Sequence, residues 1–167
     1  SYTPPPGCKA ECVIINAVEC EPYLTADHRL MLEHPAEILV GVDLIMKAVN
    51  VTKGYVGIEN NKPDAIKLMT EKAKQYPNIE IVPLKVKYPQ GGEKQLIDAV
   101  IGRQVPAPPA IPINVGAVVQ NVGTAYAIYE AVMKNKPLID RIITVTGKSV
   151  KNIARSEERR VGKECRS

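Results

Sequence analysis

The sequence contains no phenylalanine and no tryptophan, and its aromatic residues are seven tyrosines among 167 residues. A chain of this length buries roughly 70% of its extended surface on folding, so its core must be built from aliphatic residues and methionine. No apolar run approaches the roughly 20 residues that a membrane-spanning helix needs. Residues 1–7 do not have the pattern of a signal peptide. These absences, with 45% hydrophobic residues, favour a globular domain with an aliphatic core.

The sequence also has little excess of positive over negative residues. The net charge is +4, of which +2 falls in residues 155–167, so the remaining 154 residues carry only +2. A basic stripe interleaved with aromatic residues is missing, and we therefore expect no binding to nucleic acid.

Metal-binding cysteine pairs are absent as well. The four cysteines, Cys8, Cys12, Cys20 and Cys165, form neither the CxxC pairs of zinc sites nor the CxxCxxC runs of iron–sulfur sites. We expect free thiols and no metal site in this chain. Glu19 and Glu21 flank Cys20 and would oppose formation of its thiolate, so Cys20 is a poor candidate nucleophile.

What the sequence does contain is an alternation of strand and helix patterns. Helical spacing across residues 27–49 predicts two helices divided at Pro35, because proline suits a first helical turn and not an interior. Asn60 to Pro63 are expected to cap the next helix. Apolar runs predict strands at 12–16, 54–59, 79–84 and 116–119, with further helices at 63–75, at 94–101 and from the loop 120–124 to about 135. This order predicts an α/β fold with a Rossmann-like, mostly parallel sheet flanked by helices.

The chain divides into four expected parts. Residues 1–10 are rich in proline and read as an extended entry segment, and residues 11–136 form the α/β domain. Pro137 marks a boundary, after which residues 137–155 begin a second, β-rich unit with a new strand and turn at 138–147. Residues 156–167 contain one aliphatic residue in twelve and are expected to be a non-native tail.

Ligands of parallel sheets bind beyond the carboxyl ends of the strands, which selects the loops after Ile15, Leu84 and Val119. The first loop carries Asn16, Glu19 and Glu21. If it is extended, its two glutamates share one face and act either as an acid/base pair or as acceptors for a cofactor. The alternative is a solvated acidic turn.

The other two loops precede helices. Gly91 and Gly92 lie at the start of the helix after the second loop, where backbone amides favour an anion, although a plain helix entry also explains them. Asn121 and Thr124 occupy similar positions after the fourth strand and are expected helix caps. Together the three loops predict a pocket for a flat, polyhydroxylated ligand such as a nucleotide or flavin.

Three stretches carry a resemblance to a known family: NAVECEPYLTADHR at 16–29, KVKYPQGGEKQL at 85–96 and VVQNVGT at 118–124. They resemble the C subunit of the Rnf ion-translocating oxidoreductase complex, which is related to the flavin-bearing NADH-dehydrogenase subunit of respiratory complex I. The resemblance runs from about residue 4 to about residue 152. It implies a protein that takes hydride from NADH onto FMN and passes electrons to two 4Fe-4S clusters.

The resemblance also implies roles for particular residues. Asn16 would hydrogen-bond the flavin, and Glu19 and Glu21 would line the flavin and nicotinamide pocket. The residues that would flank the ring system are Tyr88, Gly91, Gly92 and Glu93. Asn121 and Thr124 would approach the ribityl phosphate. No catalytic acid or base and no metal ligand is implied within the chain.

Further expectations follow from the same resemblance. The partners would be the other Rnf subunits, with ferredoxin as redox partner, at the cytoplasmic face of the bacterial inner membrane. The unit that begins at Leu138 would be a β-grasp domain. Two other functions stay open: a cobalamin reductase of the same superfamily, and a non-catalytic scaffold module that lost its cofactor.

The family's glycine-rich phosphate loop, ending Gly-Gly-Ala-x-Phe-Pro, would lie before residue 1, and its cluster-binding cysteine repeats would lie downstream. Charge-assisted hydrogen bonds to phosphate contribute roughly 1.5–3 kcal/mol each. Without two or three of them, flavin affinity would fall on the order of a thousandfold or more. We therefore expect a polypeptide of residues 1–167 to purify colourless, and one extended through the loop to carry yellow FMN.

Overall fold

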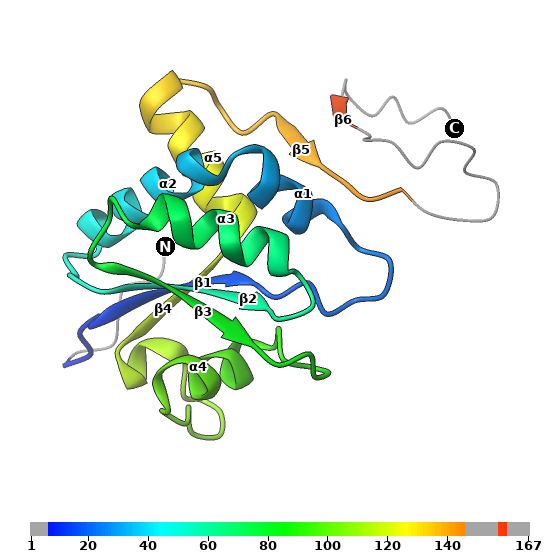
Figure 1. The fold of residues 1–167 in the computed structure, drawn as a ribbon. Helices are drawn as coiled ribbons and strands as arrows, with labels where there is room; N and C mark the ends of the chain where they lie inside the picture. The colour runs from blue at the N-terminus through cyan, green and yellow to red at the C-terminus, as the bar shows by residue number, and fades with distance from the viewer. Residues whose placement is uncertain (1–6, 146–156, 160–167) are drawn as a thin grey trace, which may run out of the picture.

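The computed structural model describes residues 7–145 and 157–159. Its regular elements alternate along the chain as strand and helix (Figure 1). In order they are β1 (Cys12–Ala17), α1 (Ala26–Glu33), α2 (Pro35–Ala48), β2 (Gly54–Glu59), α3 (Pro63–Ala73), β3 (Ile79–Leu84), α4 (Glu93–Ile101), the 3-10 helix η1 (Pro112–Val115), β4 (Ala117–Asn121), α5 (Val122–Lys134), β5 (Asp140–Ile142) and β6 (Glu157–Arg159).

The main sheet has four strands in the order β3-β2-β1-β4, and all its pairs are parallel. Strand β1 lies inside the sheet, and its run from Cys12 to Ile15 is buried. The chain moves outward from β1 to β2 and β3 and then returns to the other side of β1 with β4. The strand order therefore reverses between β1 and β4, and the carboxyl ends of these two strands form a topological switch point.

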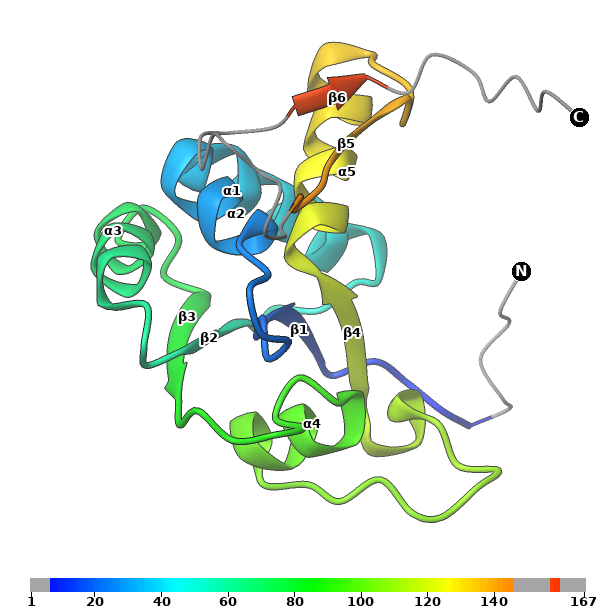
Figure 2. The same ribbon diagram turned by 90° about the vertical axis from the view of Figure 1, so that its right-hand side faces the viewer.

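Helices cover both faces of the sheet. Helices α1, α2, α3 and α5 lie over one face, while α4 and η1 lie over the other (Figures 1 and 2). Because side chains alternate along a strand, Val13 and Ile15 of β1 join the larger core cluster beneath the four helices, and Cys12 and Ile14 join the smaller cluster against α4. This arrangement confirms the predicted α/β fold.

Helices α2 and α5 approach each other closely at one glycine. A Cβ built on Gly41 would lie 1.9 Å from the backbone oxygen of Ala125, which no side chain can accommodate without moving one helix. Gly41 is itself buried in the middle of α2. The absence of a side chain at this position therefore permits the packing that positions the first turn of α5.

Most predicted elements are present, and they differ from the prediction in detail. Pro35 separates α1 from α2 as expected. The expected cap at 60–63 is wrong in part: α3 begins after Lys62 with no side-chain cap bond, although Pro63 occupies its first turn. Helix α4 starts at Glu93, one residue early, and β4 extends two residues further than predicted, to Asn121.

Beyond α5 the structure describes a short antiparallel pair, in which β5 pairs with β6. The strand expected within 138–147 is limited to Asp140–Ile142, and residues 146 and 147 lie outside the described part of the chain. The β-grasp unit and the non-native tail remain predictions, since most of residues 146–167 are also outside it. Within the described ranges, none of the helices combines the length and apolar character that crossing a membrane requires.

Candidate functional site

Asn16 joins the first predicted loop to the second. It is the penultimate residue of β1, and its Nδ2 donates to the carbonyl oxygen of Gly91 at 3.0 Å, while its Oδ1 accepts from the Val18 N–H at 3.1 Å. The contact is close, because a Cβ built on Gly91 would lie 2.8 Å from the Val18 oxygen and 3.1 Å from Cys20 Sγ. Gly91 is therefore required where the two loops pack together.

Asn121 joins the third predicted loop to the first. It is the N-cap of α5, as expected, and its Oδ1 accepts from the Gly123 N–H at 2.8 Å. Its Nδ2 lies 2.9 Å from Asp27 Oδ2 and 3.4 Å from the Asn16 oxygen. Asn16 and Asn121 are also neighbours in the β1–β4 register. The two asparagines thus tie all three loops together at the switch point.

Glu19 turns inward and caps a helix. Its side chain is only 4% exposed, and its two oxygens accept from the N–H groups of Asp27 at 2.9 Å and His28 at 3.3 Å. These donors belong to the first turn of α1, where Thr25, the N-cap, makes no side-chain capping bond. The negative charge of Glu19 is also stabilised in this position, because it faces the positive end of the helix dipole of α1.

The expectation that Glu19 and Glu21 share one face is therefore wrong. Strand β1 ends at Ala17, and the chain turns at 21–24, where the Leu24 N–H donates to the Glu21 oxygen at 3.3 Å. The alternation of an extended strand does not continue to these residues, so Glu19 is buried while Glu21 is exposed.

A buried lysine completes the environment of Glu19. Lys62 Nζ lies 3.1 Å from Glu19 Oε2 and 3.8 Å from Glu59 Oε2, and the three side chains are 10%, 4% and 2% exposed. Glu59 Oε1 has no hydrogen-bond partner among the described residues. The sequence did not lead us to Glu59 and Lys62, although a signal was available: Glu59 is the last residue of β2 and Lys62 lies three residues later, and β2 ends at the same edge of the sheet as β1, β3 and β4.

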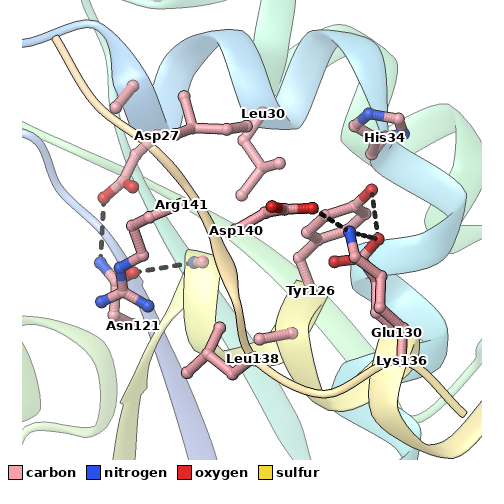
Figure 3. A pocket seen from close by; sticks show the side chains of 14 residues that line it. Asp27, Leu30, His34, Asn121, Tyr126, Glu130, Lys136, Leu138, Asp140 and Arg141 are labelled. Carbon is pink, nitrogen blue, oxygen red and sulfur yellow. Dashed lines mark hydrogen bonds and ion pairs between the residues drawn. The ribbon is translucent and has the colours of Figure 1, made fainter. Parts of the chain in front are cut away.

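Asp27 is a third residue that was not predicted from the sequence. Burial raises the pKa of the Asp27 carboxyl, the hydrogen bond from Asn121 opposes this shift, and the nearby Glu19 carboxylate adds to it. Asp27 opens onto a cavity of about 450 Å³ between α1, α5 and the segment that leads to β5 (Figure 3). Of the predicted site residues, only Asn121 lines this cavity.

On the far side of this cavity, the charged residues that line it form ion pairs and a hydrogen bond with one another. Lys136 Nζ lies 3.0 Å from both Glu130 Oε1 and Asp140 Oδ2, and the Tyr126 hydroxyl donates to Glu130 Oε1 at 3.4 Å (Figure 3). Burial, with the adjacent Glu130 carboxylate, raises the pKa of Tyr126 to about 12. The Tyr126 ring stacks on His34 with 4.8 Å between centroids.

The remaining predicted residues lie around the strand ends. Tyr88 is 75% exposed, and Glu21 and Glu93 are exposed too. Gly92 is the N-cap of α4, which therefore starts without a side-chain cap bond. Thr124 is half-buried in the first turn of α5, and the expectation that it caps this helix is wrong, because Asn121 is the N-cap.

A parallel sheet with polar loops gathered at its switch point is typical of α/β proteins that bind their ligands at this edge. The Nuo51 FMN-binding domain model matches residues 2–130 of the sequence. The chain belongs to this family, and it is a homologue of the C subunit of the Rnf ion-translocating oxidoreductase complex.

Three curated relatives illustrate this homology. The C subunit of the proton-translocating ferredoxin:NAD(+) oxidoreductase complex of Clostridium ljungdahlii is 51% identical over 148 residues, which are 89% of this chain and 32% of the relative. The C subunit of the Na(+)-translocating ferredoxin:NAD(+) oxidoreductase complex of Acetobacterium woodii is 47% identical over 89% of this chain and 33% of its own length. For the C subunit of the ion-translocating oxidoreductase complex of Citrobacter koseri the values are 41%, 86% and 20%. The chain thus spans between a fifth and a third of these relatives.

Solved structures agree with the fold. The NAD+-reducing [NiFe]-hydrogenase in its H2-reduced state matches with a TM-score of 0.62 and 25% identity, over 74% of this chain and 24% of that one. The air-oxidized state of an NAD+-reducing [NiFe]-hydrogenase gives a TM-score of 0.63 and 26% identity over the same shares.

Proposed function

We propose that this chain is the electron-input domain of an Rnf-type C subunit, which binds FMN and NADH and takes a hydride from NADH. In the longer protein the electrons would pass to two 4Fe-4S clusters, at the cytoplasmic face of the membrane, with the other subunits and ferredoxin as partners. The observation that carries the proposal is the convergence of the three motif-bearing loops at the switch point, where Asn16 and Asn121 tie them together.

The residues at this edge fit a flavin nucleotide. Asn16 and Asn121 use their amide groups within the protein, so they shape the edge of the site. The exposed carboxylates of Glu21 and Glu93 suit ribose hydroxyls and amide hydrogens. The first turn of α4 has no side-chain cap, and its N–H groups are available to an anion or a ring oxygen.

The contribution of this chain to the reaction is positional. FMN, when bound, would supply the hydride acceptor and the one-electron chemistry. Hydride transfer requires the two rings to be stacked in one orientation more than it requires an acid or a base. We propose that Glu21 binds the nicotinamide half of NADH, that Tyr88 and the 91–93 segment flank the rings, and that Glu19 acts indirectly by fixing α1.

The test uses the full-length protein. We expect it to purify with bound FMN and to oxidise NADH, and we expect Glu21→Ala to raise the KM for NADH without lowering thermal stability, because the Glu21 side chain is exposed. Glu71→Ala, which changes an exposed glutamate on α3, is the matched control. A protein that holds no FMN would overturn the proposed function, and unchanged NADH kinetics in Glu21→Ala would remove this residue from the site.

A further inference from the structure

Glu59 is a buried carboxylate that the proposed function leaves without a role. It is the last residue of β2, and its side chain is 2% exposed. Its Oε1 has no hydrogen-bond partner in the described part of the chain, and its Oε2 lies 3.8 Å from Lys62 Nζ, beyond hydrogen-bond distance. Buried polar atoms are almost always hydrogen-bonded, so the burial of this carboxylate requires an explanation.

The charge of Glu59 is not neutralised by its neighbours. Lys62 is its one ion-pair partner among the described residues, and Lys62 Nζ lies closer to Glu19, at 3.1 Å from Oε2. Glu19 also accepts from two backbone N–H groups at the start of α1. Two carboxylates thus share one ammonium group, which leaves the cluster of Glu19, Glu59 and Lys62 with a net charge of −1. Its side chains are at most 10% exposed, so salt screens this charge less than a surface charge.

The cluster lies close to the switch point of the sheet. The β1–β2 register ends with Ala17 opposite Ile58, so Glu59 follows directly after the last pair of these strands. Strands β2 and β4 flank β1, and adjacent strands are about 4.8 Å apart, so the switch point lies roughly 5–10 Å from the end of β2. At an effective dielectric constant of about 20, a unit charge at about 12 Å changes an equilibrium between two charge states about tenfold.

We propose that the Glu59 carboxylate lowers the reduction potential of the flavin. This inference rests on the proposed function, because it requires FMN at the switch point. Transfer of a hydride from NADH adds one negative charge to the flavin ring, and a negative charge fixed nearby disfavours the reduced form. The buried charge therefore favours the passage of electrons from the flavin to the next acceptor. The effect acts through space and requires no contact between Glu59 and the ring.

The experiment compares the flavin of the full-length protein with that of Glu59→Gln, which replaces the charge by a neutral group of nearly the same shape. Spectroelectrochemical titration gives the ratio of reduced to oxidised flavin at each potential. At the wild-type midpoint we expect this ratio to rise about tenfold in Glu59→Gln, which corresponds to about 30 mV for a two-electron couple. The rise should persist at high salt, because the charge is buried.

Two matched variants separate charge from packing. Glu71→Gln removes the same charge from an exposed position on α3 and should leave the flavin ratio unchanged at high salt. Glu59→Asp keeps the charge but shortens a buried side chain, so it should lose stability in urea while its flavin ratio stays within about twofold of the wild type. Glu59→Gln should show the reverse and lose no stability, because Lys62 keeps Glu19 as its partner and a costly buried charge is removed.

The outcomes keep the two proposals apart. A wild-type flavin ratio in Glu59→Gln overturns the role of Glu59, while the proposed function stands. A loss of stability in Glu59→Gln also overturns this role, because the carboxylate would then have a partner elsewhere in the full-length protein. If the full-length protein holds no flavin, the proposed function fails and the role of Glu59 fails with it.

Discussion

The loops after β1 and β3 meet at one edge of the sheet but are held there by different forces. The first is anchored to the four-helix face through buried charges, since Glu19 caps α1 and pairs with Lys62. The second has a single side-chain bond to the first, from Asn16 to Gly91, and leads to α4, whose core cluster has seven buried residues against eighteen on the other face. The first loop therefore has more buried contacts than the second, and we expect it to be the more firmly held of the two.

The largest effect on the first loop is expected from removing the buried charge of Lys62. Lys62→Met leaves the Glu19 and Glu59 carboxylates buried without their partner, and breaking a buried pair in this way costs about 3–5 kcal/mol. Urea unfolding should show that loss. Lys62→Arg, which keeps the charge, is the control and should retain most of the stability. A loss below about 1 kcal/mol in Lys62→Met would mean that the first loop is not anchored by charge.

A smaller effect is expected where the two loops touch. Gly91→Ala places a Cβ 2.8 Å from the Val18 oxygen, and overpacking of this kind costs about 1–3 kcal/mol. The midpoint of urea unfolding should fall, whereas Gln90→Ala, at the neighbouring position, should leave it nearly unchanged. Equal stability of Gly91→Ala and the wild type would show that the second loop moves away freely.

The single bond between the loops is tested by Asn16→Ala. Loss of the hydrogen bond to the Gly91 oxygen should cost about 1 kcal/mol. Hydrogen exchange should accelerate at residues 88–92 and stay slow in α1, because α1 depends on Glu19 instead. Asn60→Ala, at an exposed position after β2, is the control. Faster exchange in α1 as well would contradict the independence of the two loops.

The smallest effect concerns Asp27. Its pKa is raised above the ordinary value of 3.8, chiefly by burial, so the folded protein binds this proton more tightly than the unfolded chain. The contribution is fully present below pH 3.8 and is lost as pH rises through the folded pKa. The stability of Asp27→Asn should not decrease with pH in this way, because asparagine does not titrate.

Urea unfolding from about pH 4 to about pH 8 measures the difference. The stability of Asp27→Asn relative to the wild type should increase as the pH rises, because only the wild type loses the contribution of the raised Asp27 pKa. Parallel curves for the two proteins would contradict the raised pKa. Because Asn121 can still donate to the new amide oxygen, the tie between α1 and α5 should survive the substitution.

Strand and helix positions were predictable because local chemistry marks them. The ranges of β2 and β3 agree with prediction because Gly54 and the Pro77–Asn78 pair mark where those apolar runs begin, and Pro35 divides α1 from α2. The gathering of Asn16, Gly91 and Asn121 was predictable too, since parallel strands end at one edge.

The direction of individual side chains was not predictable in the same way. Whether Glu19 points to solvent depends on where β1 ends and on the approach of Lys62, 43 residues further along the chain. The cavity beside Asp27 needs α5 and β5 to lie against α1. Such features arise from packing between segments that are distant in the sequence, and local sequence patterns do not predict that packing.

The close approach of Gly41 to Ala125 has a consequence for how the site tolerates change. Ala125 lies in the first turn of α5, four residues after Asn121. The contact with α2 therefore sets the position of the helix that begins at this asparagine. A methyl group at position 41 would push the first turn of α5 away from α2, at the end of α5 that contacts Asp27 and the switch point. The alignment of the site therefore depends on a position in the helical layer that no ligand would ever touch.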